Sequence, residues 1–202
     1  MNLSRLFLPL VFSLLATASL AAQSATFSLP VVSGCAGETV CMPITVDDFS
    51  DVVEFGFSLR WDPECLIFEN VINRNTTVDG ESLMDINTAL SGLGSMTAFW
   101  QQWDADAGET CEDLPTGLTI ADDEILFEIC FTVDGPFGSS CDVCPFNAPQ
   151  PLTVRKKQGN GDCTDDAILG FTCGVASVCV DPLEMSLEVP FGAFQPGDLM
   201  CI

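Results

Sequence analysis

The sequence predicts an all-β domain built as an antiparallel sandwich. Two segments, 53–61 and 124–133, alternate apolar and polar side chains with the period of two that a half-buried strand shows. Shorter segments of the same character follow one another at close spacing, and Gly, Pro and Asp separate them. No long stretch has a convincing helical period, so alternating strand and helix units are not expected.

The first half of the chain contains four expected strands. Residues 26–32 and 40–46 each place apolar side chains at alternate positions. In segment 53–61 the odd positions are large and apolar and the even positions are polar or glycine, which predicts a strand with one face in the core. An Asp-Pro turn then leads into a return strand over 66–71.

The second half continues the pattern. Residues 82–90 are ambiguous between a loop and one helical turn, and 96–103 are expected to form a strand. The strand over 124–133 ends at an Asp-Gly-Pro turn. Shorter strands are expected over 141–146, 152–156, 168–173 and 177–180.

The N-terminal residues 1–22 predict a secretory signal peptide cleaved near Ala22. Arg5 precedes a run of roughly 15 apolar residues, which is short of the roughly 20 that a membrane-spanning helix needs, and small residues follow. We therefore expect a domain at 25–180 that is secreted, extracellular or on the cell surface, without insertion of the mature chain into a membrane.

The C-terminal tail, 181–202, contains one more candidate strand. Its apolar side chains alternate with polar ones and are those of Leu183, Met185, Leu187 and Val189. Such a strand either pairs with its own sheet or exchanges onto the edge of a neighbouring molecule, because an exposed edge is a template for strand addition.

Cysteine usage predicts a disulfide framework. The chain has 11 cysteines, all after the predicted cleavage site, as in exported domains with oxidised cysteines. Zinc binding is the competing use, and Cys141 and Cys144 have ligand-like spacing, but the sequence has no second pair of this kind and no histidine. The odd count leaves one thiol, either buried and inert or joined to a second chain.

Two disulfide pairs are expected from the strand pattern. Cys41 and Cys130 each lie on the polar face of an alternating strand, so they can meet on the outer surface if these strands are antiparallel neighbours in register. Cys173 and Cys179 are close enough in sequence to join across a tight hairpin.

The charge is strongly acidic, with 29 acidic and 6 basic residues and a formal net charge of −23. Such a surface repels nucleic acid, so no nucleic-acid partner is expected, and it favours cation binding. Asp104, Asp106 and Glu109 form a candidate calcium loop, because calcium takes hard oxygen ligands from flexible loops. A solvated acidic loop is the alternative.

Catalysis is not expected. Histidine and tyrosine are absent, which removes imidazole bases and the Ser-His-Asp and Cys-His arrangements. The most aromatic stretch contains Trp100 and Trp103, which would point to opposite faces of a strand, so one of them could be exposed and contact a polysaccharide. A role in the core is the alternative.

The motifs resemble those of a known family. The stretch "SGCAGETVCMPITVDDFSDVVEFGFSLRWDPECLIFENV" (33–71) resembles the first part of a cohesin module, and "LPTGLTIADDEILFEICFTVDG" (114–135) and "GSSCDVCPF" (138–146) resemble its later strand and turn. The resemblance implies a flattened jelly roll of about nine strands that works by protein recognition. Cohesins on cellulosome scaffolds bind dockerin modules through one sheet face, and many cohesin-like modules have no known dockerin partner.

Three functions follow as hypotheses. The first is a secreted, non-enzymatic interaction or structural module of the cohesin type, with a dockerin-like protein as partner. The second is a self-assembling extracellular filament or matrix subunit, linked through its terminal strands or an intermolecular disulfide. The third is a carbohydrate-binding module.

Overall fold

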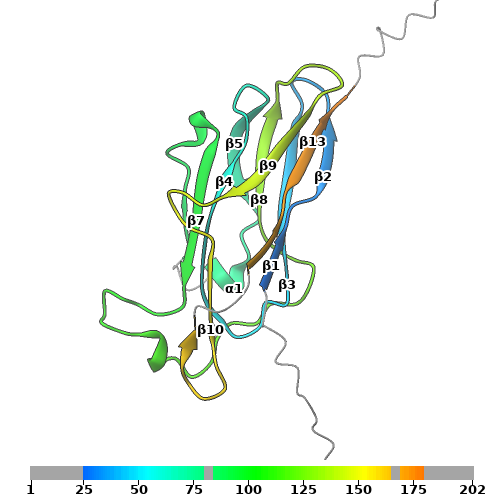
Figure 1. The fold of residues 1–202 in the computed structure, drawn as a ribbon. Helices are drawn as coiled ribbons and strands as arrows, with labels where there is room; N and C mark the ends of the chain where they lie inside the picture. The colour runs from blue at the N-terminus through cyan, green and yellow to red at the C-terminus, as the bar shows by residue number, and fades with distance from the viewer. Residues whose placement is uncertain (1–24, 80–83, 165–168, 180–202) are drawn as a thin grey trace, which may run out of the picture.

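The strands form two sheets that face each other, as Figure 1 shows for the computed structural model, which describes residues 25–79, 84–164 and 169–179. The elements in chain order are β1 (Ala25–Ser28), β2 (Val31–Gly34), β3 (Thr39–Asp47), β4 (Val52–Arg60), β5 (Leu66–Ile72), α1 (Thr76–Asp79), β6 (Met84–Asn87), η1 (Ser91–Leu93), β7 (Ser95–Gln101), η2 (Cys111–Asp113), β8 (Glu124–Val133), β9 (Ser140–Phe146), β10 (Thr153–Lys157), β11 (Cys163–Thr164), β12 (Leu169–Thr172) and β13 (Gly174–Val178).

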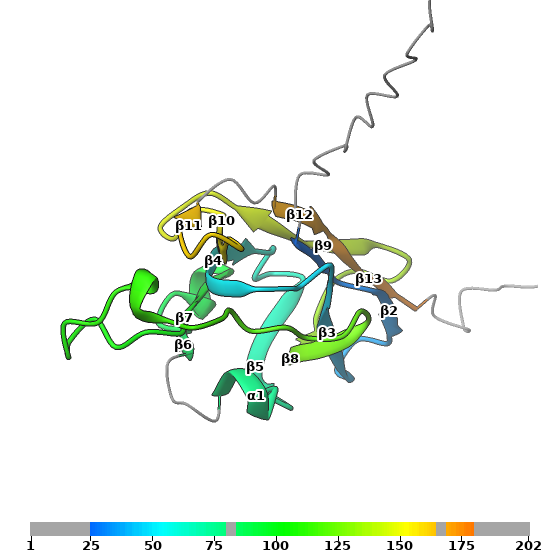
Figure 2. The ribbon, with the colours of Figure 1, turned by 90° about the horizontal axis from the view of Figure 1, so that it is seen from below.

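One sheet has five strands in the order β12-β1-β3-β8-β5, and the other has eight, with the path β11-β10-β4-β9-β13-β2 and with β7 and β6 added beside β4. Figure 2 shows the two layers from below. The predicted all-β sandwich is confirmed. Part of the ambiguous segment 82–90 forms β6, which pairs with β7.

The first and the last strands of the described chain pass from one sheet to the other side by side. The expected strand 26–32 is split at Pro30 into β1 and β2, because proline has no N–H for a sheet ladder. β1 pairs in parallel with β12, and β2 pairs in parallel with β13. At the second crossing, a Cβ added to Gly174 would lie 2.7 Å from the Leu29 Cβ, so the two bends pack against each other.

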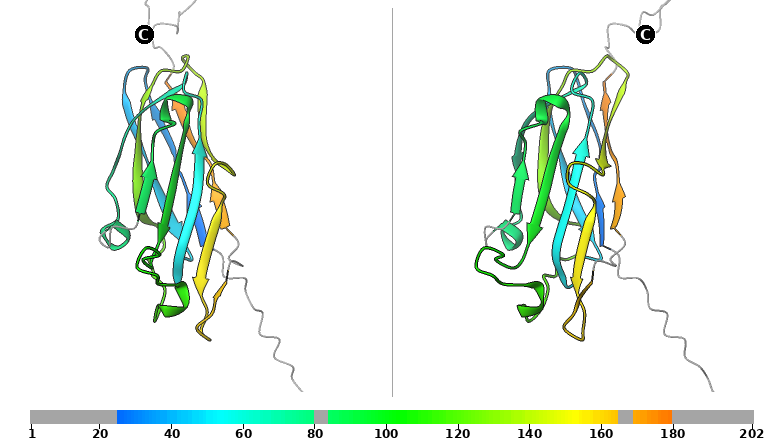
Figure 3. Two further views of the ribbon diagram at one scale, coloured as in Figure 1. Left: turned by 90° about the vertical axis from the view of Figure 1, so that its left-hand side faces the viewer. Right: turned by 60° about the vertical axis from the view of Figure 1, so that its left-hand side comes forward.

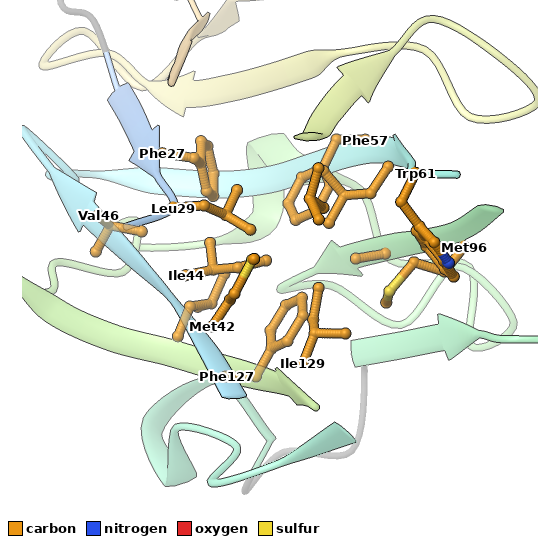
Figure 4. Close-up of a cluster of buried hydrophobic side chains, with 14 of the residues drawn as sticks. Phe27, Leu29, Met42, Ile44, Val46, Phe57, Trp61, Met96, Phe127 and Ile129 are labelled. Carbon is orange, nitrogen blue, oxygen red and sulfur yellow. The ribbon is translucent and has the colours of Figure 1, made fainter. Parts of the chain in front are cut away.

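The core lies between the sheets. In Figure 4, Phe27, Ile44, Phe57 and Phe127 point toward one another from strands of both sheets. The odd positions of β4 are buried, as the alternation predicts. Phe57 lies centrally among them, with ring centroids 5.3 Å from Phe27 and 6.3 Å from Phe127.

The even positions of β4 depart from the prediction, because Gly56 and Ser58 are also buried. The connection between β9 and β10 folds over them. The Ser58 hydroxyl donates to the Gln150 carbonyl at 2.8 Å and accepts from the Gln150 backbone N–H at 3.0 Å. A Cβ on Gly56 would collide with the Gln150 side chain, so glycine at this position lets the connection lie flat on the sheet.

Five disulfides are present among the described residues: Cys35–Cys179, Cys41–Cys130, Cys65–Cys141, Cys111–Cys163 and Cys144–Cys173. Cys41 and Cys130 face each other in the antiparallel register of β3 and β8, which confirms the predicted pair. The eleventh cysteine, Cys201, lies outside the described residues.

The predicted pair Cys173–Cys179 is wrong. No hairpin joins these residues, because β13 runs as an extended strand between them and carries Cys179 away from Cys173. Cys179 therefore meets Cys35 beside the end of β2, and Cys173 meets Cys144 of β9.

The predicted signal peptide, 1–22, lies outside the described residues. So do the tail 181–202 and its candidate exchange residues Leu183, Met185, Leu187 and Val189. Within the ranges that the structure describes, no helix is long and apolar enough to cross a membrane.

Candidate binding surfaces

The outer face of the eight-stranded sheet is broad and mostly polar. β6, β7, β4 and β10 lie side by side across it, and their register places Asp85, Phe99, Gly56 and Thr153 in one row. The Gln150 connection covers the part of this row over β4. The Gln150 connection leaves the β6–β7 side, the β13–β2 side and the two ends of the sheet open to a partner.

A groove of about 570 Å³ lies at one end of this sheet, where β4 ends and β9 begins. It is called the end groove below, and it is lined by Arg60, Trp61, Asp62, Pro63, Cys65, Leu93, Ser140, Cys141, Asp142, Cys144, Pro145 and Phe146. Figure 3 shows the green η1 turn, which supplies Leu93, at the same upper end of the sandwich as the end of cyan β4.

Two exposed apolar side chains line the end groove. Leu93 is 74% exposed and Phe146 is 41% exposed. The Arg60 guanidinium lies over the Phe146 ring at 5.4 Å, a cation–π contact that fixes this ring. Two disulfides that include lining cysteines, Cys65–Cys141 and Cys144–Cys173, hold β9 to β5 and to the end of β12. The groove therefore combines exposed apolar side chains with a polar lining, and the two disulfides support it.

Sequence reasoning missed the end groove, although one signal was available. In segment 141–146, Phe146 shares the polar face of the strand with Asp142 and Cys144, so it is an apolar side chain where alternation calls for a polar one. Leu93 gives no comparable signal, because its exposure follows from a turn that returns the chain from β6 to β7.

The tryptophans proposed for polysaccharide contact are buried. Trp100 is 3% exposed and stacks on Phe55 inside the sandwich, with ring centroids 5.6 Å apart. Trp103 is 8% exposed, and the Arg155 guanidinium lies over its ring at 5.7 Å while forming an ion pair with Glu54 at 3.4 Å. The expectation of an exposed ring is wrong. The main core covers Trp100, and Val53, Cys111 and the Arg155 guanidinium cover Trp103. A polysaccharide partner therefore finds no exposed ring at these two residues.

The candidate calcium residues hold their own loop together. The Asp104 carboxylate accepts from the N–H groups of Asp106 and Ala107, and Glu109 accepts from the Asp104 N–H. Among the described residues, no group of three or more potential metal ligands is close enough to hold an ion. Cys141 and Cys144 are each in a disulfide, so the zinc alternative is excluded for this pair.

Calcium binding stays a prediction with a direct test. If Asp104, Asp106 and Glu109 bind the ion, millimolar calcium raises the melting temperature, and Asp106→Asn removes the rise because that carboxylate would lose a ligand charge. Differential scanning calorimetry with and without chelator measures this. Equal melting temperatures in the two buffers would contradict the prediction.

The two lysines of the chain are buried and support the other end of the sheet. Lys157 Nζ donates to the carbonyls of Cys111 and Glu112 at 2.9 and 3.1 Å, which anchors the acidic loop. Lys156 Nζ donates to the Asp48 carbonyl at 2.9 Å. Burial lowers the pKa of Lys156 from its usual 10.5, and the charges of Asp48 and Asp51 oppose this shift. The Thr110 hydroxyl and backbone N–H both donate to Asp113 and lower its pKa.

The lowered pKa of Lys156 predicts a pH dependence of stability. Between its folded and unfolded pKa values the unfolded chain holds more protons, so the free energy of unfolding rises with pH. We expect this rise as the pH approaches 10.5 from below, and Lys156→Met abolishes it whereas Lys157→Met keeps it. Urea titrations at each pH measure it, and no tyrosine titrates in this range because the chain has none. A flat profile for the unaltered protein would refute the assignment.

No family model and no curated protein matches this chain. Its fold is similar to those of solved cohesins. The seventh ScaB type I cohesin from Pseudobacteroides cellulosolvens aligns with a TM-score of 0.60 at 16% identity, over 85% of this chain and 98% of that chain. The sixth cohesin from scaffoldin B of Acetivibrio cellulolyticus, solved in complex with a mutant Cel5 dockerin, aligns with a TM-score of 0.55 at 15% identity, over 77% and 99%.

A non-cellulosomal cohesin from the hyperthermophilic archaeon Archaeoglobus fulgidus is also similar, with a TM-score of 0.53 at 14% identity, over 80% of this chain and 95% of that one. These alignments span nearly the full length of each solved module. The chain therefore has a cohesin-like fold, as its motifs predict.

Proposed function

We propose that this chain is a secreted, non-enzymatic module that binds another protein through the outer face of its eight-stranded sheet. The observation that carries the proposal is the cohesin-like fold, in which that face combines a broad polar surface with the exposed apolar side chains of the end groove. One similar cohesin was solved in complex with a dockerin, so a dockerin-like module is the first partner to test.

Secretion is supported by the cysteines. Ten of them form disulfides, and such bridges persist in oxidising compartments. Together with the predicted signal peptide at 1–22, these disulfides support our proposal that the module works outside the cytoplasm, in an extracellular or cell-surface assembly. Mass spectrometry of the exported protein should find its N-terminus near Ala22, and an intact N-terminus would contradict cleavage.

Surface plasmon resonance against a panel of purified dockerin modules tests the binding function. We expect saturable binding by at least one of them, lost in Thr97→Arg, which places a long charged side chain on the β6–β7 side of the eight-stranded face. Thr39→Arg is the matched control, because Thr39 is exposed on β3 in the other sheet. Absence of binding across the panel would overturn the dockerin-like partner, and equal loss in both variants would overturn the choice of face.

Self-assembly is a second candidate, favoured by the edge strand β2. Among the described strands, β2 pairs only with β13 and ends the eight-stranded sheet, and its Val31 is 72% exposed. Such an edge can accept a strand from a neighbouring molecule, for which segment 183–189 is the candidate. Native mass spectrometry without reductant should then show oligomers that Leu187→Asp removes, and oligomers removed only by Cys201→Ala would indicate a disulfide link instead. A monomer at all concentrations would contradict self-assembly.

A further inference from the structure

We infer that the end groove binds a segment of the partner protein that carries a large apolar side chain next to a lysine or arginine. This inference rests on the proposed function, that the chain binds a protein, and it assigns both the place and the chemistry of the contact.

The large apolar side chain of the partner segment is inferred from the residues that line the end groove. Leu93 and Phe146 are exposed, and Pro63 and Pro145 also line the groove, so hydrocarbon groups are in contact with water within a lining that is otherwise polar. The volume of about 570 Å³ falls within the range of ligand pockets. A leucine, methionine or aromatic side chain of a partner would remove this surface from water.

Trp61 lines the groove with little of its surface, since it is 3% exposed and its ring packs against those of Phe68 and Phe131. Its indole N–H is buried, so a partner in the groove does not reach it. The contact with the partner is therefore made by the exposed side chains of the lining, Leu93 and Phe146.

The lysine or arginine of the partner segment is inferred from the negative charge of the groove lining. Asp62 and Asp142 line the groove, and Glu64 is exposed beside it. Arg60 is the one cation in the lining, and its guanidinium is already stacked on Phe146. Three carboxylates and the net charge of −23 therefore favour a cationic segment and repel an acidic one. The same charge disfavours a second copy of this chain in the groove.

Selection of a phage-displayed random peptide library on the oxidised full-length protein tests the inference. Enriched peptides should pair a large apolar residue with an adjacent lysine or arginine. Fluorescence polarisation with the best synthetic peptide should show at least tenfold weaker binding to Leu93→Asp and Phe146→Asp. Asp62→Asn combined with Asp142→Asn should weaken binding several-fold and reduce its salt dependence. Phe137→Asp is the matched control, because Phe137 is 53% exposed and does not line the groove.

The outcomes separate this inference from the function on which it rests. Enriched peptides without a basic residue, or binding that Leu93→Asp and Phe146→Asp leave unchanged, would overturn the groove assignment. A dockerin module that binds Leu93→Asp at full affinity and loses binding in Thr97→Arg would also overturn it, while the proposed function stands. A folded protein that binds neither the dockerin panel nor any selected peptide would overturn both.

Discussion

Replacing Phe57 with alanine is expected to lower the free energy of unfolding by about 3–5 kcal/mol. Phe57 is fully buried on β4, and its ring contacts those of Phe27, Phe127 and Phe171 from three different strands. The substitution loses the transfer free energy of the ring and leaves a cavity, because the Cys65–Cys141 disulfide ties the start of β5 to β9 of the other sheet and limits how far the sheets can close. Urea unfolding of the oxidised protein, followed by tryptophan fluorescence, measures the change.

Phe146→Ala is the matched control for this substitution. It removes the same side chain from the same sheet, but Phe146 is 41% exposed, so the expected loss is below about 1 kcal/mol. Equal losses in the two variants would mean that the centre of the sandwich is not where the protein gains its stability.

The alternation that marks Phe57 as core also shows how much of the fold the sequence could predict. Segments that alternate with a period of two locate β3, β4 and β8. The same alternation places Cys41 and Cys130 on the polar faces of β3 and β8, which leads to the pair. Both predictions succeed because the alternation depends only on local backbone geometry. Pairings that depend on how the chain crosses between sheets could not be found in this way. Cys173 and Cys179 are near in sequence, but the bend at Gly174 and the strand after it separate them.

The candidate site was less predictable than the fold. The end groove arises because the end of β4, the η1 turn and the start of β9 converge, and only the tertiary structure brings Leu93 near Phe146. The burial of Ser58 has the same origin, since the strand pattern shows a polar face but not the connection that covers it. The burial of Trp103 likewise depends on Val53 and Arg155, which are far away in sequence.

Removing the Cys35–Cys179 disulfide is expected to cost about 3 kcal/mol of the free energy of unfolding. This bridge joins residues 144 apart in sequence and fastens the end of β2 to the end of β13, a parallel pair of only four aligned residues. In the chain-entropy account, the bridge limits the unfolded chain, and the neighbouring bridges shorten the loop that it closes to a few tens of residues, which sets the estimate. Short parallel pairing alone contributes little against this loss.

The double variant Cys35→Ala with Cys179→Ala should be compared with the intact bridge in a Cys201→Ala background. That background removes the eleventh thiol, so that no unpaired cysteine attacks the remaining bridges during the measurement. We expect a lower urea midpoint and faster amide exchange in β2 and β13, with exchange in β3 and β8 less affected because Cys41–Cys130 still joins them. An unchanged midpoint would show that the parallel pair holds without its bridge. The first and last described strands pass from one sheet to the other side by side. If the midpoint is unchanged, the region that unfolds first should therefore be sought at the bends by Pro30 and Gly174.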